Sequence, residues 1–163
     1  FMVERDQRLV VLGFGDEYHN SLLKRIAAQY PHHVSVTIGF DERLAHQIEA
    51  GTDVFLMPSR SEPCGLNQLY SLKYGTIPVV GAVGGLKDTI IDYTRSPGTA
   101  NGFTFEEHTP SGFLDALTRA SALYRDAAKW KKLIKKAMAC DFSWQRSARE
   151  YGELYQRIIK EKR

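Results

Sequence analysis

The sequence predicts an α/β fold of the Rossmann-like kind: an open parallel sheet flanked by helices and followed by C-terminal helices. Two observations predict it. Short apolar runs alternate with segments of helical length, and only helical patterns follow residue 108. Strand, helix and strand in series form right-handed βαβ units and therefore a parallel sheet. With 163 residues, 43% of them hydrophobic, the chain is long enough for a sizeable core, and we expect residues 1–163 to form a single domain.

The expected strands are short runs rich in apolar and β-branched residues, as in strands that helices cover on both faces. Four such runs lie at residues 9–12, 34–38, 54–57 and 77–80. We expect a fifth strand at residues 102–105. The connecting segments 18–29, 42–49 and 66–74 are each long enough for about two to four helical turns. One face of the third segment carries Leu66, Leu69, Tyr70 and Lys73 at helical spacing.

The region after residue 108 is expected to be all-helical. Thr109 is placed to cap a helix through its hydroxyl, with Pro110 at the first helical position. A second helix, over residues 127–139, has an apolar side made of Trp130, Leu133, Ile134 and Ala137, with lysines on the other side.

Ser143 is placed to cap a last helix, after a break at residues 141–143. Its apolar stripe consists of Trp144, Ala148, Tyr151, Tyr155 and Ile158. This stripe docks either on the sheet or, in part, on a second domain. We therefore expect residues 109–163 to be partly available for packing on a further domain.

Composition and charge exclude several classes of protein. The formal net charge of +3 is too small to indicate nucleic-acid binding. No apolar run approaches the roughly 20 residues that span a membrane, and the first residues lack the features of a signal peptide. Cys64 and Cys140 are too few for a disulfide scaffold, and the histidines show no metal-ligand spacing. We expect a reducing cytosol, and neither membrane nor nucleic-acid partners.

Four loops follow the first four expected strands, at residues 13–16, 39–42, 58–66 and 81–86, and each contains glycine. Ligands of open parallel sheets bind beyond the carboxyl ends of the strands, where helix N-termini point. Four such loops at one edge predict a binding cleft there.

The third loop indicates the chemistry of the ligand. Gly65 lies in the first turn of the following helix, where it permits close approach to backbone N–H groups that suit phosphate oxygens. The Glu62 carboxylate repels phosphate, so its natural partners are hydroxyls. Phosphate and hydroxyls together describe a sugar nucleotide. The alternative is that Glu62 only complements the helix dipole.

The residues of this loop carry a family resemblance. Residues 58–70, Pro-Ser-Arg-Ser-Glu-Pro-Cys-Gly-Leu-Asn-Gln-Leu-Tyr, resemble the signature of bacterial glycogen synthases and plant starch synthases. Residues 73–78, 84–89 and 141–144 are similar to that family in order and spacing, and Gly-Phe-Gly-Asp at 13–16 resembles its Gly-Thr-Gly-Asp. The resemblance implies a GT-B fold of two Rossmann-like domains. It also implies a retaining transfer of glucose from ADP-glucose to the non-reducing end of an α-1,4-glucan, without a metal or other cofactor.

The resemblance also implies roles for individual residues. Glu62 matches the donor-site glutamate that contacts the glucosyl hydroxyls, and Phe40 matches an aromatic residue that packs against adenine. The other implied donor contacts are the backbone amides of Cys64, Gly65 and Leu66, the side chain of Tyr70, and the glycine loops with Gly84, Gly85, Gly13 and Gly15.

Motifs of the family's N-terminal domain, including its Lys-Thr-Gly-Gly-Leu segment and the cations that neutralise the diphosphate, have no counterpart in this sequence. We therefore interpret the chain as the donor-binding C-terminal domain of a larger enzyme, nearly inactive alone, with the glucan held mainly by the N-terminal domain. The resemblance implies the bacterial cytoplasm or, for a plant protein, a plastid. A stand-alone nucleotide-sugar-binding module without catalysis is the alternative.

Three other interpretations are weaker. A dinucleotide fingerprint at Gly13 and Gly15 has Tyr18 in place of its third glycine, which opposes close helix–strand packing. Cys64 follows the pattern of a nucleophile at a helix start, but no histidine lies near it in sequence, and we expect a half-buried packing residue. The third is a site for anionic partners at the lysines between residues 129 and 136; we expect these lysines to form a solvated helix face instead.

Overall fold

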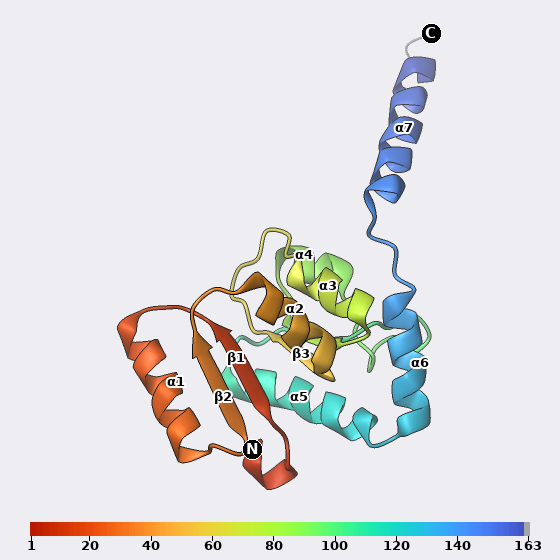
Figure 1. Ribbon diagram of the computed structural model, residues 1–163. Helices are drawn as coiled ribbons and strands as arrows, with labels where there is room; N and C mark the ends of the chain where they lie inside the picture. Colours follow the sequence, from red (N-terminus) through yellow and green to blue (C-terminus); the bar gives the residue numbers. More distant parts are fainter. Residues whose placement is uncertain (162–163) are drawn as a thin grey trace. The chain divides into compact units, whose positions relative to one another are not determined.

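The computed structural model describes residues 1–161, which divide into two compact units, Phe1–Gly51 (unit 1) and the chain from Thr52 onward (unit 2). Both units are built from parallel strands and helices (Figure 1). The expected α/β class with parallel sheets flanked by helices is therefore confirmed. No helix within the described range is both long enough and apolar enough to cross a membrane.

Unit 1 is a two-stranded parallel sheet with its connecting helices. Its elements are the short 3-10 helix Val3–Arg5, then β1 (Leu9–Gly13), α1 (Glu17–Gln29), β2 (Val34–Ile38) and α2 (Glu42–Gly51). Strands β1 and β2 pair in register, Leu9 opposite Val34. Asp16 caps α1, because its carboxylate accepts a hydrogen bond of 3.0 Å from the backbone N–H of His19. The hydrogen bonds from the backbone and ring of His19 hold the pKa of Asp16 below its ordinary value.

Unit 2 contains a three-stranded parallel sheet in the order β3-β4-β5. Its elements are β3 (Val54–Met57), α3 (Asn67–Tyr74), β4 (Ile77–Gly81), α4 (Gly84–Thr89), β5 (Phe103–Phe105), α5 (Pro110–Tyr124), α6 (Ala127–Met138) and α7 (Trp144–Glu161). All five expected strands are present. Helix α4 was not expected, because its two opening glycines indicated a loop.

The core of unit 2 lies around the central strand. Every residue of β4 and β5 is buried, whereas β3 is half-buried along its length. Helices α3, α5 and α6 contribute to this core, with Leu72, Ala116 and Leu133 among the buried residues. The expected cap of α5 is confirmed, because the Thr109 hydroxyl accepts a hydrogen bond of 3.1 Å from the backbone N–H of Gly112.

The buried face of α3 differs from the one that apolar spacing indicated. Gln68, Ser71 and Leu72 are buried, whereas Leu66 and Tyr70 are exposed. Two of the three buried residues are polar, so a rule based on apolar periodicity selects the wrong side.

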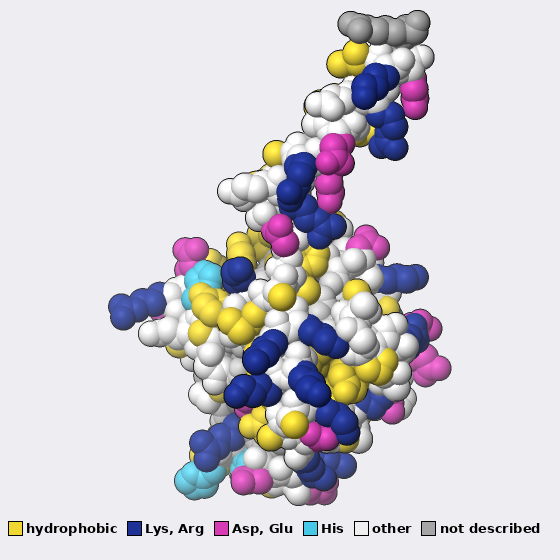
Figure 2. Space-filling view, turned by 90° about the vertical axis from the view of Figure 1, so that its right-hand side faces the viewer, with side chains coloured by type: hydrophobic (Ala, Val, Ile, Leu, Met, Phe, Trp, Pro, Cys, Tyr) yellow, Lys and Arg dark blue, Asp and Glu magenta, His cyan; other side chains and the backbone are white. Residues whose placement is uncertain are grey.

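Helix α6 buries its expected apolar side through Trp130, Leu133 and Ala137. Figure 2 looks onto the side of Figure 1 where α6 lies and shows Lys and Arg side chains gathered there. Most of the lysines of α6 are exposed, as expected for a solvated face. Lys136 is half-buried and donates to the carbonyls of Pro97 and Gly98, at 2.6 and 2.7 Å.

Helix α7 does not dock on the β3-β4-β5 sheet of its own unit. None of its residues is buried, and Trp144, Tyr151 and Tyr155 are all at least 60% exposed. Its apolar stripe is therefore unpartnered within the described part of unit 2. Of the two expected alternatives, packing against the sheet is wrong, and packing on a further domain stays a prediction.

Candidate functional site

The loop between β3 and α3 holds the Glu62 side chain, which has no hydrogen-bond or ion-pair partner in the described part of the chain. Glu62 is half-buried, and among residues 1–161 its carboxylate makes neither a hydrogen bond nor an ion pair. Its backbone carbonyl, in contrast, accepts a hydrogen bond of 3.2 Å from the N–H of Gly85 at the start of α4. The loop backbone is thus fixed to the start of α4, while the carboxylate keeps its full capacity to accept hydrogen bonds from a ligand.

The next part of this loop presents backbone donors. Within the described part of the chain, the N–H groups of Cys64, Gly65 and Leu66 donate no hydrogen bond. Leu66 is the N-cap of α3 and supplies no side-chain cap. The start of α3 therefore offers unsatisfied N–H groups and the positive end of a helix dipole, an arrangement that favours an anionic ligand.

Cys64 differs from its expected role as a half-buried packing residue. Its thiol side chain is exposed, so it does not contribute to the core. The residue matters here through its backbone, whose carbonyl accepts a hydrogen bond of 3.0 Å from the side chain of Gln68.

Gly84 and Gly85 stand where α4 meets the Glu62 loop. A Cβ atom on Gly84 would overlap the carbonyl oxygen of Glu62, and one on Gly85 would overlap that of Cys64. These contacts are with backbone, which has little room to move. The lack of side chains at Gly84 and Gly85 is therefore required for packing of the loop on α4, a role that the sequence pattern did not indicate.

Tyr70 lies in the first half of α3, and its ring is partly exposed. It shares this helix with the uncapped N-terminus described above, but no described contact joins its side chain to Glu62.

The remaining expected residues belong to unit 1. Gly13 ends β1, and its carbonyl accepts a hydrogen bond of 3.0 Å from the N–H of Gly39, so the loops after β1 and β2 are adjacent. Gly15 is held by the side chain of Asn20 through bonds of 3.1 and 2.9 Å. The Phe40 ring is 83% exposed, so it is accessible to a ligand.

His108 is a residue near this loop that the sequence did not single out. Its ring packs on Phe105 with 5.5 Å between ring centroids, and neither of its buried ring nitrogens has a partner among the described residues. A Cβ atom on Gly81 would lie 2.6 Å from the ring and 2.8 Å from the carbonyl oxygen of Ser59. His108 therefore fills the space beside the end of β4, and no motif could have placed it there.

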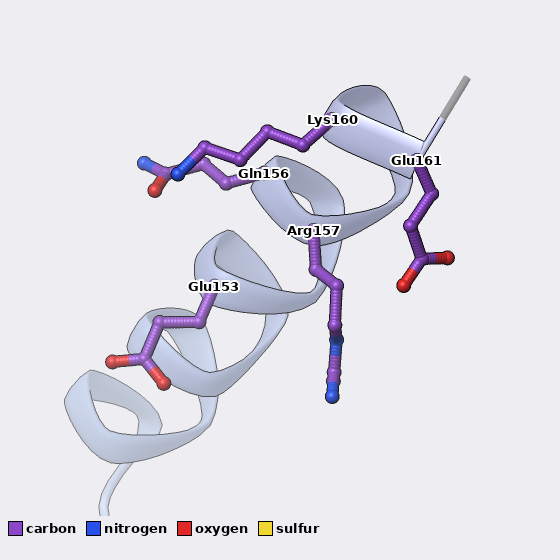
Figure 3. A pocket seen from close by; sticks show the side chains of 5 residues that line it. All are labelled: Glu153, Gln156, Arg157, Lys160 and Glu161. Atoms are coloured by element: carbon purple, nitrogen blue, oxygen red, sulfur yellow. The ribbon is translucent and has the colours of Figure 1, made fainter. Parts of the chain in front are cut away.

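A surface hollow lies away from this loop, on α7. It is lined by five side chains that all project from α7, as Figure 3 shows: Glu153, Gln156, Arg157, Lys160 and Glu161. A hollow whose only wall is one helix does not enclose a ligand. Across residues 1–161, no cluster of three or more His, Cys, Asp or Glu side chains is arranged to hold a metal ion.

Comparison with known proteins identifies a family whose model includes this loop. The model of the family described as glycosyl transferases group 1 matches residues 3–137. The chain belongs to this family. The match spans the Glu62 loop, the start of α3 and the glycines of α4.

Glycogen and starch synthases are among the proteins that the chain is similar to. Glycogen synthase 2 of Nitrosococcus oceani is 48% identical over 157 residues, and glycogen synthase of Geotalea daltonii is 52% identical over 155 residues. The catalytic domain of starch synthase IV from Arabidopsis thaliana, solved bound to ADP and acarbose, is 38% identical, with a TM-score of 0.85 over 97% of this chain. The chain spans about a third of the length of these relatives, 32% of each glycogen synthase and 34% of the starch synthase chain.

Proposed function

We propose that the chain is the donor-binding part of a glycogen or starch synthase. The complete enzyme would transfer glucose from ADP-glucose to the non-reducing end of an α-1,4-glucan, with retention of configuration. The similarity to glycogen synthases at about half of all positions favours this enzyme over a stand-alone binding module. The related starch synthase domain was solved with ADP and acarbose, which supports a nucleotide-sugar ligand here.

One observation carries the proposal. In a single loop the Glu62 carboxylate and three consecutive backbone N–H groups all lack partners among residues 1–161. We assign the N–H groups of Cys64, Gly65 and Leu66 to the diphosphate or sugar oxygens, because helix-start donors stabilise negative charge. We assign Glu62 to the glucosyl hydroxyls, which donate hydrogen bonds that a carboxylate accepts.

Further assignments complete the proposal. The exposed Phe40 ring is suited to pack against adenine, and Gly13, Gly15 and Tyr70 remain proposed donor contacts. Gly84 and Gly85 would act by shaping the loop, in keeping with their packing. The proposed transfer uses no metal or cofactor, so EDTA should leave its rate unchanged. The isolated chain is expected to be nearly inactive, with the glucan held mainly by the remainder of the enzyme.

The test uses the full-length protein with ADP-glucose and glycogen, and measures ADP release together with glucose incorporation. We expect transfer from ADP-glucose, and a comparison with UDP-glucose measures the preference for the base. Absence of transfer from both donors would refute the proposed function.

Two variants test the assigned roles separately. Glu62→Ala should lower kcat severely and leave ADP affinity nearly unchanged, because the carboxylate is assigned to the sugar. Phe40→Ala should weaken ADP binding, since stacking on the base is lost. Near-normal turnover of Glu62→Ala contradicts its place in the site, and unchanged ADP affinity of Phe40→Ala contradicts the stacking role.

A further inference from the structure

Gln68 is a buried polar residue to which the proposed function gives no role. It lies in the first turn of α3, and its side chain is 0% exposed. The side-chain nitrogen Nε2 donates to the carbonyl oxygens of Cys64 and Gly65, at 3.0 and 3.1 Å. Because both of these partners are acceptors, they fix which end of the amide carries the NH2 group.

The same amide connects the loop to α4. Nε2 of Gln68 lies 3.4 Å from Oγ1 of Thr89, and this hydroxyl donates to the carbonyl of Gly85 at 2.6 Å. The N–H of Gly85 in turn donates to the carbonyl of Glu62 at 3.2 Å. The loop is therefore held to both helices through its carbonyl groups, whereas the N–H groups of Cys64, Gly65 and Leu66 have no partner among residues 1–161.

The geometry of the peptide bond determines where the N–H groups of Gly65 and Leu66 point. In a trans peptide the C=O of one residue and the N–H of the next point in opposite directions, and every peptide bond of this loop is trans. The carbonyls of Cys64 and Gly65 converge on the buried amide of Gln68. The N–H groups of Gly65 and Leu66 must therefore point away from that amide.

The backbone conformation of Gly65 permits its close contact with Gln68. Its φ angle is +76°, in the left-handed region that favours glycine, and a Cβ atom there would lie 2.9 Å from Cδ and from Nε2 of Gln68. Gly65 thus has the backbone conformation, and lacks the side chain, that allow Gln68 to reach both carbonyls.

We propose that Gln68 is a positioning residue that aims the N–H groups of Gly65 and Leu66 at the nucleotide-sugar donor by binding the carbonyls of Cys64 and Gly65. The inference rests on the proposed function, since the donor is the ligand assigned to those N–H groups. It adds a requirement on a buried side chain that does not touch the donor.

The test is the steady-state kinetics of Gln68→Met and Gln68→Glu in the full-length enzyme. Methionine keeps the length of the side chain but has no hydrogen-bond donor, and an ionised glutamate would place negative charge against two carbonyl oxygens. We expect the KM for ADP-glucose to rise about tenfold in Gln68→Met, as expected when hydrogen bonds to a charged group are lost, and further in Gln68→Glu. The KM for the glucan should not change.

This pattern separates positioning from general loss of structure. Partial unfolding lowers the concentration of active enzyme, so it reduces the apparent kcat and moves neither KM. Ser71→Ala is the matched control, because Ser71 is buried on the same face of α3 and its hydroxyl donates only to the backbone carbonyl of Gln68, at 2.9 Å. We expect Ser71→Ala to keep both KM values within about twofold, the change that loss of one neutral internal hydrogen bond permits.

The outcomes are distinguishable. A wild-type enzyme that transfers no glucose from ADP-glucose contradicts the proposed function, and the inference with it. If the wild type is active and Gln68→Met has the same KM for ADP-glucose, the positioning role alone is overturned. This variant removes the side-chain hydrogen-bond donor without adding charge. An equal rise of the donor KM in Ser71→Ala also overturns it.

Discussion

Asp92 is the residue of unit 2 whose substitution by asparagine gives the sharpest test of the fold. It is 6% exposed, and its carboxylate accepts hydrogen bonds from the backbone N–H groups of Thr104 and Thr94, at 2.7 and 2.8 Å. The guanidinium of Arg119 donates to the same carboxylate at 3.0 Å and to the carbonyl of Thr104 at 2.8 Å. These bonds tie β5 and α5 to the segment that precedes β5.

The expected loss in the free energy of unfolding follows from the acceptor oxygen and the charge that asparagine lacks. It has one acceptor oxygen instead of two, so one backbone donor, of Thr94 or Thr104, faces an NH2 group, and an unsatisfied buried donor costs about 1–3 kcal/mol. Removing one partner of a buried ion pair costs about 3–5 kcal/mol, but the side chain of Arg119 is 27% exposed, and solvent reduces that part. We therefore expect Asp92→Asn to lower the free energy of unfolding by about 3 kcal/mol.

Urea unfolding followed by tryptophan fluorescence measures this loss. The chain has two tryptophans, and Trp130 is buried at 6% exposure whereas Trp144 is 87% exposed. Trp144→Phe in every sample makes Trp130 the single reporter of unit 2. Asp115→Asn is the matched control: Asp115 contacts the same Arg119 at 2.9 Å but is 69% exposed, so we expect a loss below about 1 kcal/mol. Equal losses in the two variants would refute the reasoning.

The effect of Asp92→Asn should also depend on pH. Burial raises the pKa of Asp92, but the hydrogen bond from Thr104 and the charge of Arg119 outweigh burial and hold the pKa below its ordinary value. A lowered pKa stabilises the fold above the unfolded carboxyl pKa, and this contribution is lost as the pH falls through the lowered value. The difference between wild type and variant should be constant from about pH 5 to 8 and should shrink below about pH 4. A difference that grows with acid contradicts this sign.

Two further substitutions test the core and a helix cap. Phe103→Ala removes a ring that is 1% exposed in β5 and should lower the free energy of unfolding by about 3–5 kcal/mol; a loss below 1 kcal/mol in the same urea experiment contradicts the burial. Thr109→Ala removes the side-chain cap of α5 and should cost about 1 kcal/mol, whereas Thr109→Ser keeps the hydroxyl and should restore most of it. An alanine variant as stable as the serine variant shows that the cap contributes nothing.

The sequence predicts the elements of the fold well where the pattern is apolar and regular. Strand β2 is found at the residues expected, and the Thr109–Pro110 start of α5 is confirmed, because a cap and a strand pattern are local signals. Helix α4 was missed because glycine at both of its first positions is read as a turn, whereas the structure requires those glycines for contact with the Glu62 loop.

The candidate site was predictable only in part for a related reason. Glu62 and the N-terminus of α3 follow from motif and helix chemistry. The role of Gln68 does not follow from either, because its side chain contacts the carbonyl of Cys64 and the hydroxyl of Thr89 only in the folded chain. His108 was also missed, since its place beside Gly81 results from packing between segments distant in sequence.

The absence of buried residues in α7 has a consequence for how this protein tolerates cleavage. The last well-packed element is α6, and Cys140 just after it still packs against the core. Trypsin has targets on α7 at Arg146, Arg149 and Arg157, and none of the side chains of α7, up to Glu161, that cutting there removes is buried. The energetic boundary of the folded core thus lies near Cys140, so a nicked molecule should melt at the same temperature as an intact one.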